Sequence, residues 1–246
     1  MIKKRLNKKE IANIKKLVKS GSSLNKISKL TNKSKTTVYY YFRKFKGRTI
    51  SPIKINTKNK EFVGEFIGLF AGDGCMYKTK DYNYRTYLHF NKTEKKFVED
   101  LIGKVLVKLF EKEPMIFKPG NRLNLCYCSK GIHQFISEYL VWDQNYRKTY
   151  SVRLKEGKYG KQFIIGFIRG SLDSDGYFSK NKISFATVSP GLKKNIIEFL
   201  DILSITHTVR LYKEKRKNRK GIYHITVWKK DHNKFINLIK PRNKWD

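Results

Sequence analysis

Two aspartates stand at the ends of two similar stretches of this 246-residue sequence. The first stretch reads EFVGEFIGLFAGDG from Glu61, and the second reads KQFIIGFIRGSLDSDG from Lys161. Aligned on the final Asp-Gly, the matching pairs are each 102 residues apart: Gly64 with Gly166, Gly68 with Gly170, Gly72 with Ser174, and Asp73 with Asp175. One Asp-Gly pair is a common helix cap or turn, but two copies in register favour a shared function.

A carboxylate at the end of a helix implies a bound cation. The C-terminal end of a helix carries partial negative charge, so an acid there is disfavoured by about 0.3–1 kcal/mol unless a cation neutralises it. A divalent metal would do so. The pattern therefore predicts that Asp73 and Asp175 bind metal.

The small residues in both stretches predict how these acids are positioned. Glycine inside a helix costs about 1 kcal/mol relative to alanine, so three small residues spaced four apart on one face call for compensation. Such faces let two helix backbones approach closely. We therefore expect the two helices to pack on each other and bring their ends together.

After each Asp-Gly the same order of elements follows. In the first copy we expect strands over 75–80 and 84–91, a helix over 94–110, strands over 115–118 and 122–128, and a helix over 131–139. In the second copy we expect strands over 177–179 and 183–187, a helix over 190–202, strands over 208–215 and 222–228, and a helix over 231–239. Each half is then αββαββα.

The two motifs resemble one known family. FIGLFAGDG (66–74) and IRGSLDSDG (168–176) resemble the nine-residue LAGLIDADG motif of homing endonucleases, which single-chain members carry twice. The glycine at the third position, the acid at the eighth and the glycine at the ninth recur in both copies. In the first copy Ala71 replaces the first Asp of the motif, and in the second Arg169 and Ser171 are polar insertions. Those positions usually tune packing rather than chemistry.

The resemblance implies a fold and an activity. The fold is α+β, with two pseudo-symmetric αββαββα repeats over 59–150 and 159–246 that form a DNA-binding saddle about a pseudo-twofold axis. The activity is site-specific double-strand cleavage of DNA, with Mg²⁺ as cofactor and Mn²⁺ as a substitute. Metal activates water and stabilises the leaving oxygen of the phosphodiester.

The resemblance also assigns site residues. The metal acids are Asp73 and Asp175, and the metal site includes the preceding Gly72 and Ser174. A second recurring feature pairs SKGIHQFI with KKDHNKFI at a spacing of 100, which aligns Lys130 with Lys230 and Phe135 with Phe235. In the family a basic residue here lies beside the cleavage centre. Lys130 and Lys230 are therefore further catalytic candidates, placed to polarise water or to stabilise charge on the phosphate.

The charge of the chain predicts a polyanionic partner. The chain has 55 Lys and Arg residues but only 20 Asp and Glu residues, so its formal net charge is +35. A charge of this size and sign is typical of proteins that bind polyanions. No apolar run approaches the roughly 18–20 residues of a spanning helix, and no signal peptide is visible. We expect an intracellular, cytoplasmic or organellar protein, associated with the nucleoid and not with membrane. The strands and turns offer these basic DNA-contact candidates: Lys78, Lys80, Arg85, Arg122, Arg210, Lys213, Lys215, Arg216 and Arg219.

The first fifty residues predict a small all-α domain over 1–50. Apolar spacing predicts helices over 8–19, 24–30 and 35–45. Ser23 is expected to cap the second helix, and Ser34 is expected to cap the third. In the second helix Leu24, Ile27 and Leu30 are expected to face inward. This stretch resembles the helix-turn-helix of resolvase-like and transposase-like DNA-binding domains. Its third helix would present these residues to DNA: Lys35, Thr36, Thr37, Tyr40 and Arg43. The alternative is a plain three-helix bundle with solvated lysines. A linker is expected near 46–58.

Other functions stay open on sequence alone. The chain could be a non-catalytic DNA-binding regulator that descends from a nuclease, or an intron RNA maturase, because charge cannot distinguish RNA from DNA. Intein residues are lacking, so a nuclease would be free-standing or encoded in an intron. Because one chain carries both motif copies, we expect a monomer that acts on a long, weakly symmetric duplex.

Overall fold

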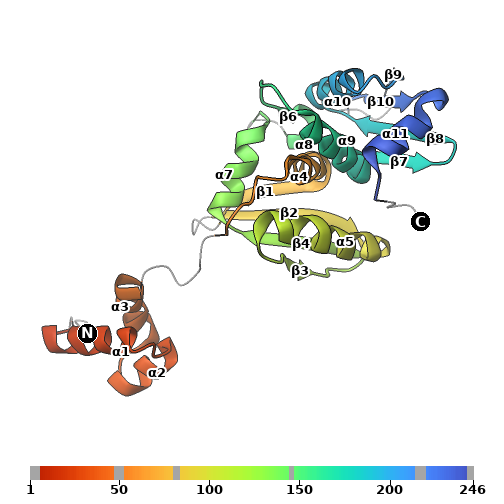
Figure 1. Cartoon of the computed structure of the whole chain (residues 1–246). Helices are drawn as coiled ribbons and strands as arrows, with labels where there is room; N and C mark the ends of the chain where they lie inside the picture. The colour runs from red at the N-terminus through yellow and green to blue at the C-terminus, as the bar shows by residue number, and fades with distance from the viewer. Residues whose placement is uncertain (1–5, 47–52, 80–83, 144–146, 214–219, 243–246) are drawn as a thin grey trace. The chain divides into compact units, whose positions relative to one another are not determined.

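The computed structural model describes residues 6–46, 53–79, 84–143, 147–213 and 220–242. The chain divides into two compact units, Met1–Pro52 and Ile53–Asp246 (Figure 1). Each unit has its own hydrophobic core. Among the described residues, no helix combines the length and the apolar character needed to cross a bilayer.

The described residues of the first unit form three short helices, as predicted: α1 (Lys8–Lys19), α2 (Leu24–Thr31) and α3 (Lys35–Lys46). Hydroxyl caps fix where two of them begin. Ser23 Oγ accepts from Lys26 N and Ser34 Oγ accepts from Thr37 N, both at 3.3 Å. The core side chains come from all three helices: Ile14, Val18, Ile27, Val38 and Phe42.

The second unit contains the two predicted repeats. The first begins with α4 (Lys60–Asp73), β1 (Gly74–Lys78) and β2 (Tyr84–Asn91). A continuous helical segment follows, made of η1 (Lys92–Glu94), α5 (Lys95–Leu101), the π-helix η2 (Ile102–Leu106) and α6 (Val107–Phe110). The repeat ends with β3 (Met115–Phe117), β4 (Arg122–Cys128) and α7 (Lys130–Tyr139). The second comprises α9 (Lys161–Asp175), β7 (Gly176–Ser179), β8 (Lys182–Thr187), α10 (Pro190–Ile202), β9 (His207–Tyr212), β10 (Ile222–Val227), η3 (Lys229–Asp231) and α11 (His232–Ile239).

A connection that the sequence did not predict joins the repeats. It is formed by β5 (Leu140–Val141), α8 (Lys148–Ser151) and β6 (Arg153–Leu154), and β5 pairs with β6 in a two-stranded antiparallel sheet. The apolar residues Leu140, Val152 and Leu154 are buried in the main core. The connection is therefore a packed element of the unit.

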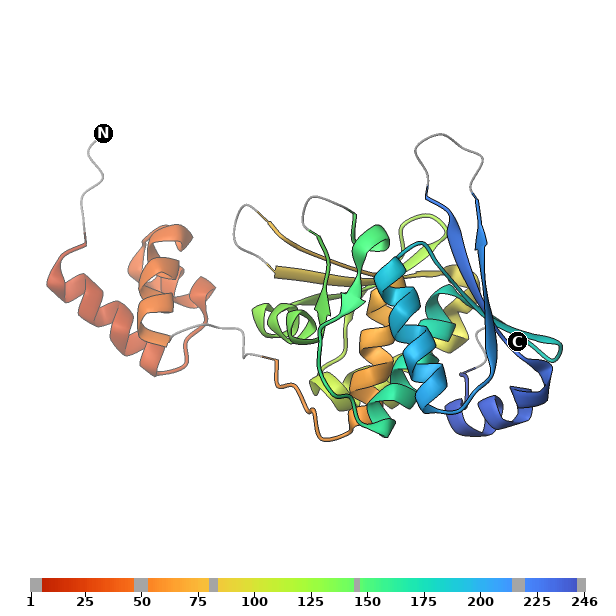
Figure 2. The same cartoon turned by 90° about the horizontal axis from the view of Figure 1, so that it is seen from above.

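The two larger sheets have the same topology. Their strand orders are β1-β2-β4-β3 and β7-β8-β10-β9, with every neighbouring pair antiparallel. The helices α4 and α9 lie side by side between the two sheets (Figures 1 and 2). With α7 and α11 as the last helices of the repeats, this arrangement confirms the predicted α+β fold of two αββαββα repeats.

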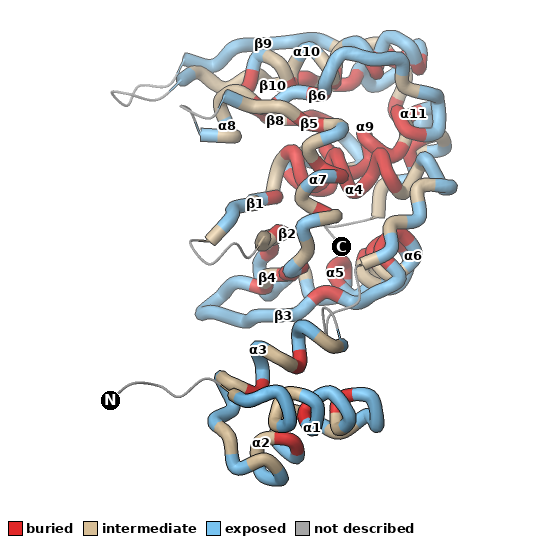
Figure 3. The backbone as a smooth tube through the Cα atoms, turned by 90° about the vertical axis from the view of Figure 1, so that its left-hand side faces the viewer, coloured by how far each residue is buried: buried red, intermediate tan, exposed pale blue. Residues whose placement is uncertain are grey.

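The glycines of α4 and α9 allow the backbones of the two helices to touch. A Cβ on Gly64 would overlap the carbonyl oxygen of Phe163, and one on Gly170 would overlap the carbonyl oxygen of Glu65. Figure 3 shows both helices buried along most of their length. The close approach predicted from the small-residue spacing is therefore confirmed.

The polar insertion at Arg169 takes part in a buried ion-pair network across this helix pair. Its guanidinium contacts Glu61 Oε1 at 2.6 Å and Glu65 Oε2 at 2.9 Å, and its Nε donates to the Ile239 carbonyl at 2.6 Å. Glu65 is fully buried and also accepts from Arg242, which extends the network beyond α11. Because these charges are paired and hydrogen-bonded, their burial is tolerated.

Candidate functional site

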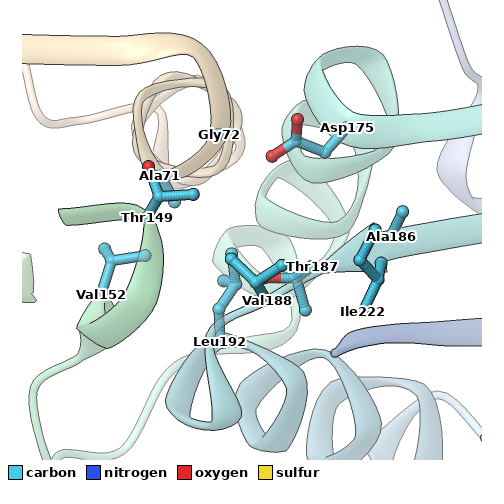
Figure 4. A pocket seen from close by; sticks show the side chains of 10 residues that line it. All are labelled: Ala71, Gly72, Thr149, Val152, Asp175, Ala186, Thr187, Val188, Leu192 and Ile222. Carbon is cyan, nitrogen blue, oxygen red and sulfur yellow. The ribbon is translucent and has the colours of Figure 1, made fainter. Parts of the chain in front are cut away.

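The ends of the two central helices meet. Asp73 is the last residue of α4 and Asp175 the last of α9. A Cβ on Gly72 would lie 2.8 Å from Asp175 Oδ2, so that carboxylate lies directly against the end of α4. Figure 4 shows the Asp175 side chain directed toward Gly72. The structure thus brings together the acids and the small residues predicted from the repeat, with Ser174 buried beside Gly72.

A lysine from the connection between the repeats caps α4. Lys148 Nζ, from α8, donates to the carbonyl oxygens of Phe70 and Ala71 at 2.7 Å and of Gly72 at 2.9 Å. These carbonyls form the negative end of the helix. The lysine thus provides a cation at the helix end that bears Asp73.

The charge on Lys148 is subject to opposing influences. Burial lowers the pKa of Lys148 to about 8, although the carboxylates of Asp175 and Asp73 act in the opposite direction. The ammonium is therefore near enough to both acids to interact with them. Sequence reasoning missed this residue, because it is one lysine among many on a helix too short to show periodicity.

The oxygen atoms at this junction suit a hard divalent cation. Carboxylates and backbone carbonyls are the ligand types that Mg²⁺ prefers, and Mg²⁺ commonly takes only one or two carboxylates and completes its shell with water and phosphate. Within the described ranges no cluster of three or more His, Cys, Asp or Glu could hold a metal. An ion here would thus depend on Asp73, Asp175 and nearby carbonyls.

A pocket of about 140 Å³ opens beside the two helix ends. Gly72 and Asp175 line it together with Thr149 of α8 and Thr187 of β8 (Figure 4). Its volume admits a few water molecules, since each occupies roughly 30 Å³ in the liquid. Water can therefore reach the Asp175 carboxylate from this side.

The prediction that Lys130 lies beside the acids is wrong. β1 leaves the centre at Gly74, and its other end, Lys78, pairs with Tyr84. Ser129 N donates to the Tyr84 carbonyl at 3.0 Å, so Lys130 follows at this far end. Four residues of strand span roughly 13 Å, which separates Lys130 from Asp73.

The same reasoning applies to Lys230. Gly176, next to Asp175, pairs with Phe185, and Phe185 pairs with Ile225. β10 continues to Val227, and Lys230 lies beyond its end, where its ammonium stands over the Trp228 ring at 5.1 Å. The two lysines align in sequence because each stands where the last helical segment of its repeat begins: Lys130 is the first residue of α7, and Lys230 lies in η3 directly before α11. Neither of these positions is at the centre.

The predicted basic contacts divide by sheet face. In each strand, core residues alternate with residues on the opposite side, which we call the open face. The pairing register places Arg85, Arg122 and Arg210 on the open faces and Lys78 on the other face of β1. Lys213 is exposed just after β9. The remaining candidates lie outside the described residues: Lys80, Lys215, Arg216 and Arg219.

In the first unit the predicted contact residues lie along α3. Lys35, Thr36 and Arg43 are exposed, and Tyr40 has 65% of its surface exposed. Thr37 is half-buried, and its hydroxyl is within 2.9 Å of Ser34 Oγ, so it contributes to the helix cap. The exposed side chains leave this face of α3 available for a partner.

Comparisons with known proteins agree with this architecture. The family described as "LAGLIDADG-like domain" matches residues 162–239, and the family "Helix-turn-helix domain of resolvase" matches residues 3–44. An uncharacterized protein of Methanocaldococcus jannaschii is 27% identical over 168 residues. That alignment covers 64% of this chain and 55% of the relative, so the chain spans about half the length of the curated relative that it matches.

Solved structures share the fold of the second unit. I-DmoI G20S in complex with its target DNA in the presence of Mg is 19% identical, with a TM-score of 0.54, over 75% of this chain and 98% of that chain. I-DmoI in complex with DNA and Mn is 20% identical, with a TM-score of 0.53, over 74% and 97%. The homing endonuclease I-WcaI bound to its DNA recognition sequence is 15% identical, with a TM-score of 0.50, over 82% and 88%.

At these identities the likeness of the solved structures establishes the fold alone, while the two family matches identify the domains. The chain therefore combines a resolvase-type helix-turn-helix domain with a LAGLIDADG-like domain that has the fold of the homing endonuclease I-DmoI.

Proposed function

We propose that this protein is a site-specific double-strand DNA endonuclease of the homing type that uses Mg²⁺, with Mn²⁺ as a substitute. The observation that carries the proposal is the meeting of Asp73 and Asp175 at the ends of two packed helices, one from each repeat. One acid from each repeat on a common axis accounts for the cutting of both strands by one chain. The resemblance of the motif to LAGLIDADG supports the same roles.

DNA is the favoured substrate. The net charge of +35 suits a polyanion, and the open faces bear Arg85, Arg122 and Arg210. Solved proteins with this fold are bound to their target DNA. Two-stranded β-ribbons fit the major groove, so two sheets in one monomer suit a long, weakly symmetric duplex.

The residues at the junction divide the chemical work. Asp73 and Asp175, with the Gly72 and Ser174 backbone, would hold the divalent ion. When bound, such an ion activates water and stabilises the leaving oxygen of the phosphodiester. Lys148 holds the end of α4 in place through its three carbonyl contacts. Its positive charge beside the acids also offsets the negative charge that develops on the phosphate during hydrolysis.

Replacing Lys148 with methionine should slow cleavage more than it weakens binding. The loss expected in cleavage rate at saturating DNA is about a hundredfold, which is typical of removing one group that stabilises transition-state charge. Gel-shift titration gives the affinity, and single-turnover cleavage gives the rate. Lys130→Met and Lys230→Met serve as matched controls, with rates near that of the parent because both lysines lie away from the acids. A Lys148→Met variant that cuts at the parent rate would contradict this role.

The helix-turn-helix domain should extend the protein's footprint on DNA. Deleting residues 1–50 should weaken binding and flatten its dependence on salt by about one unit of slope for each phosphate that the domain neutralises in the intact protein. Metal-dependent cutting should remain, since the acids lie in the other unit. A narrower test compares Lys35→Gln with Arg43→Gln on α3 and uses Lys8→Gln on α1 as a control. Unchanged affinity of the truncated chain at every salt concentration would leave the alternative of a plain helical bundle.

The proposal is tested by mapping cleavage on a randomised duplex DNA library with Mg²⁺ present. The expected result is a double-strand cut at one family of related sites, and no cut when the metal is chelated. Sequence-specific binding without cutting would favour a non-catalytic regulator. Preference for a structured intron RNA over duplex DNA in competition would favour a maturase.

A further inference from the structure

The open face of the first sheet is apolar for so basic a chain. The pairing register places this set on it, of which Cys126 alone is buried: Cys75, Tyr77, Arg85, Tyr87, His89, Asn91, Met115, Phe117, Arg122, Asn124, Cys126 and Cys128. Arg85 and Arg122 alone among them are lysine or arginine. All three cysteines of the chain are included. Aromatic and sulfur-bearing side chains therefore dominate a surface that faces away from the core.

Much of this apolar surface is exposed. Met115 and Phe117 lie on the edge strand β3, and each has 46% of its surface exposed. Tyr77 is 42% exposed, and its ring stacks on Tyr87 at 5.9 Å, while Tyr87 stacks on His89 at 5.7 Å. The stacked rings restrict one another. The open face is therefore an apolar surface of stacked rings, and it lies beside the exposed edge strand β3.

At the positions that correspond to Met115 and Phe117, the second sheet is polar. Met115 pairs with Cys126 on β4, and the equivalent pair on the second edge is Thr208 with Thr226. Phe117 pairs with Asn124, and its equivalent is Arg210 with His224. The two repeats thus share topology but present different chemistry at the edge strand.

Apolar side chains have one characteristic contact in the DNA major groove. Thymine alone among the four bases presents a methyl group there, and apolar side chains recognise it. Phosphates are contacted instead by cations, hydroxyls and amides. A hydroxyl and arginine face such as that of the second sheet suits hydrogen-bonding base edges. The difference between the sheets therefore predicts a difference between the two halves of the target.

We propose that the first sheet reads thymine methyl groups through Met115 and Phe117, so that the half of the target under the first repeat is rich in T·A pairs. This proposal rests on the proposed function only in taking duplex DNA as the substrate. It concerns binding and can be tested without cutting.

The experiment selects bound duplexes from a randomised library with the full chain in EDTA. The expected enrichment contains at least two fixed T·A pairs in one half-site. Replacing these thymines with deoxyuridine, which lacks the methyl group, should weaken binding about fourfold per methyl. The same replacement in the other half-site should leave affinity unchanged. Equal affinity for thymine and uracil duplexes, equal losses in both halves, or a selection without sequence preference would each overturn the proposal.

Two variants connect the effect to the edge strand. Phe117→Ser should abolish the thymine preference at one position, whereas Ile116→Ser should preserve it. Ile116 is a matched control because it is 48% exposed on the same strand but pairs with Leu125 on the other face. If Phe117→Ser instead converts a dimer to a monomer and leaves the loss of affinity on uracil substitution unchanged, Phe117 forms a contact between copies of the chain. The proposal is then overturned. If the protein cuts DNA but binds thymine and uracil duplexes equally, this proposal alone is refuted. If it prefers thymine duplexes but does not cut, the proposed nuclease activity alone is refuted.

Discussion

Replacing Gly170 with alanine should destabilise the LAGLIDADG-like unit by about 3 kcal/mol or more, at or above the upper end of the range for overpacked cores. The added Cβ would overlap the Glu65 carbonyl oxygen and lie 2.7 Å from Leu69 N. Both are backbone atoms of α4, so no side chain can rotate away to relieve the overlap. Denaturant unfolding of the full chain, followed by circular dichroism, measures the change in the free energy of unfolding.

Gly103→Ala is the matched control for this substitution. Gly103 also lies in a helical segment, but a Cβ there would meet nothing within 4 Å. Alanine should therefore leave stability unchanged or raise it by up to about 1 kcal/mol through its higher helix propensity. If the two variants had equal stability, the two motif helices would not pack as closely as described.

Replacing either Asp73 or Asp175 with asparagine should abolish double-strand cleavage or slow it about a thousandfold. Asparagine keeps the size and capping ability of aspartate but removes the charge that binds a divalent ion, and metal stabilisation of the transition state amounts to about 4 kcal/mol. Residual nicking of one strand is compatible with loss of one acid. Single-turnover cleavage on supercoiled plasmid separates nicked from linear product.

Folding and DNA binding serve as internal controls for these variants. Neither should change much, because lysines and arginines supply the affinity. Asp201→Asn is a matched substitution at an exposed acid, whose side chain is 66% exposed, and it should cut like the parent. If the deficit in cleavage merely followed a lower melting temperature, the aspartates would be helix caps and not metal ligands.

The fold was predictable because its determinants are local and repeated. The Gly64, Gly68 and Gly72 spacing signals a close helix pair, and strict alternation identifies strands such as β2. Leu30 shows the limit of periodicity, since it was expected to face inward and is 60% exposed. The periodic spacing of apolar residues identifies which face of a helix is apolar. It does not show how much of that face a neighbouring helix covers.

The site was only partly predictable. The meeting of Asp73 and Asp175 was predicted because the motif recurs at a fixed spacing, whereas Lys148 lies in the connection between the repeats, outside the motifs that recur. Its place depends on how β5 and β6 fold the chain back, which is a tertiary effect. The prediction that Lys130 and Lys230 lie beside the acids was wrong. Aligning the repeats identifies equivalent positions in the fold, but it does not give their distance from the centre.

The central claim is that Asp73 and Asp175 form a paired, metal-dependent centre for cutting DNA. Its most direct test is cleavage of the mapped target by the parent and by the Asp73→Asn, Asp175→Asn double variant, each with Mg²⁺ and with EDTA, at protein concentrations that saturate binding. We expect double-strand cleavage by the parent with Mg²⁺ alone, and equal binding but no cleavage by the double variant. A parent that cuts in EDTA, or a double variant as active as the parent, would contradict the account.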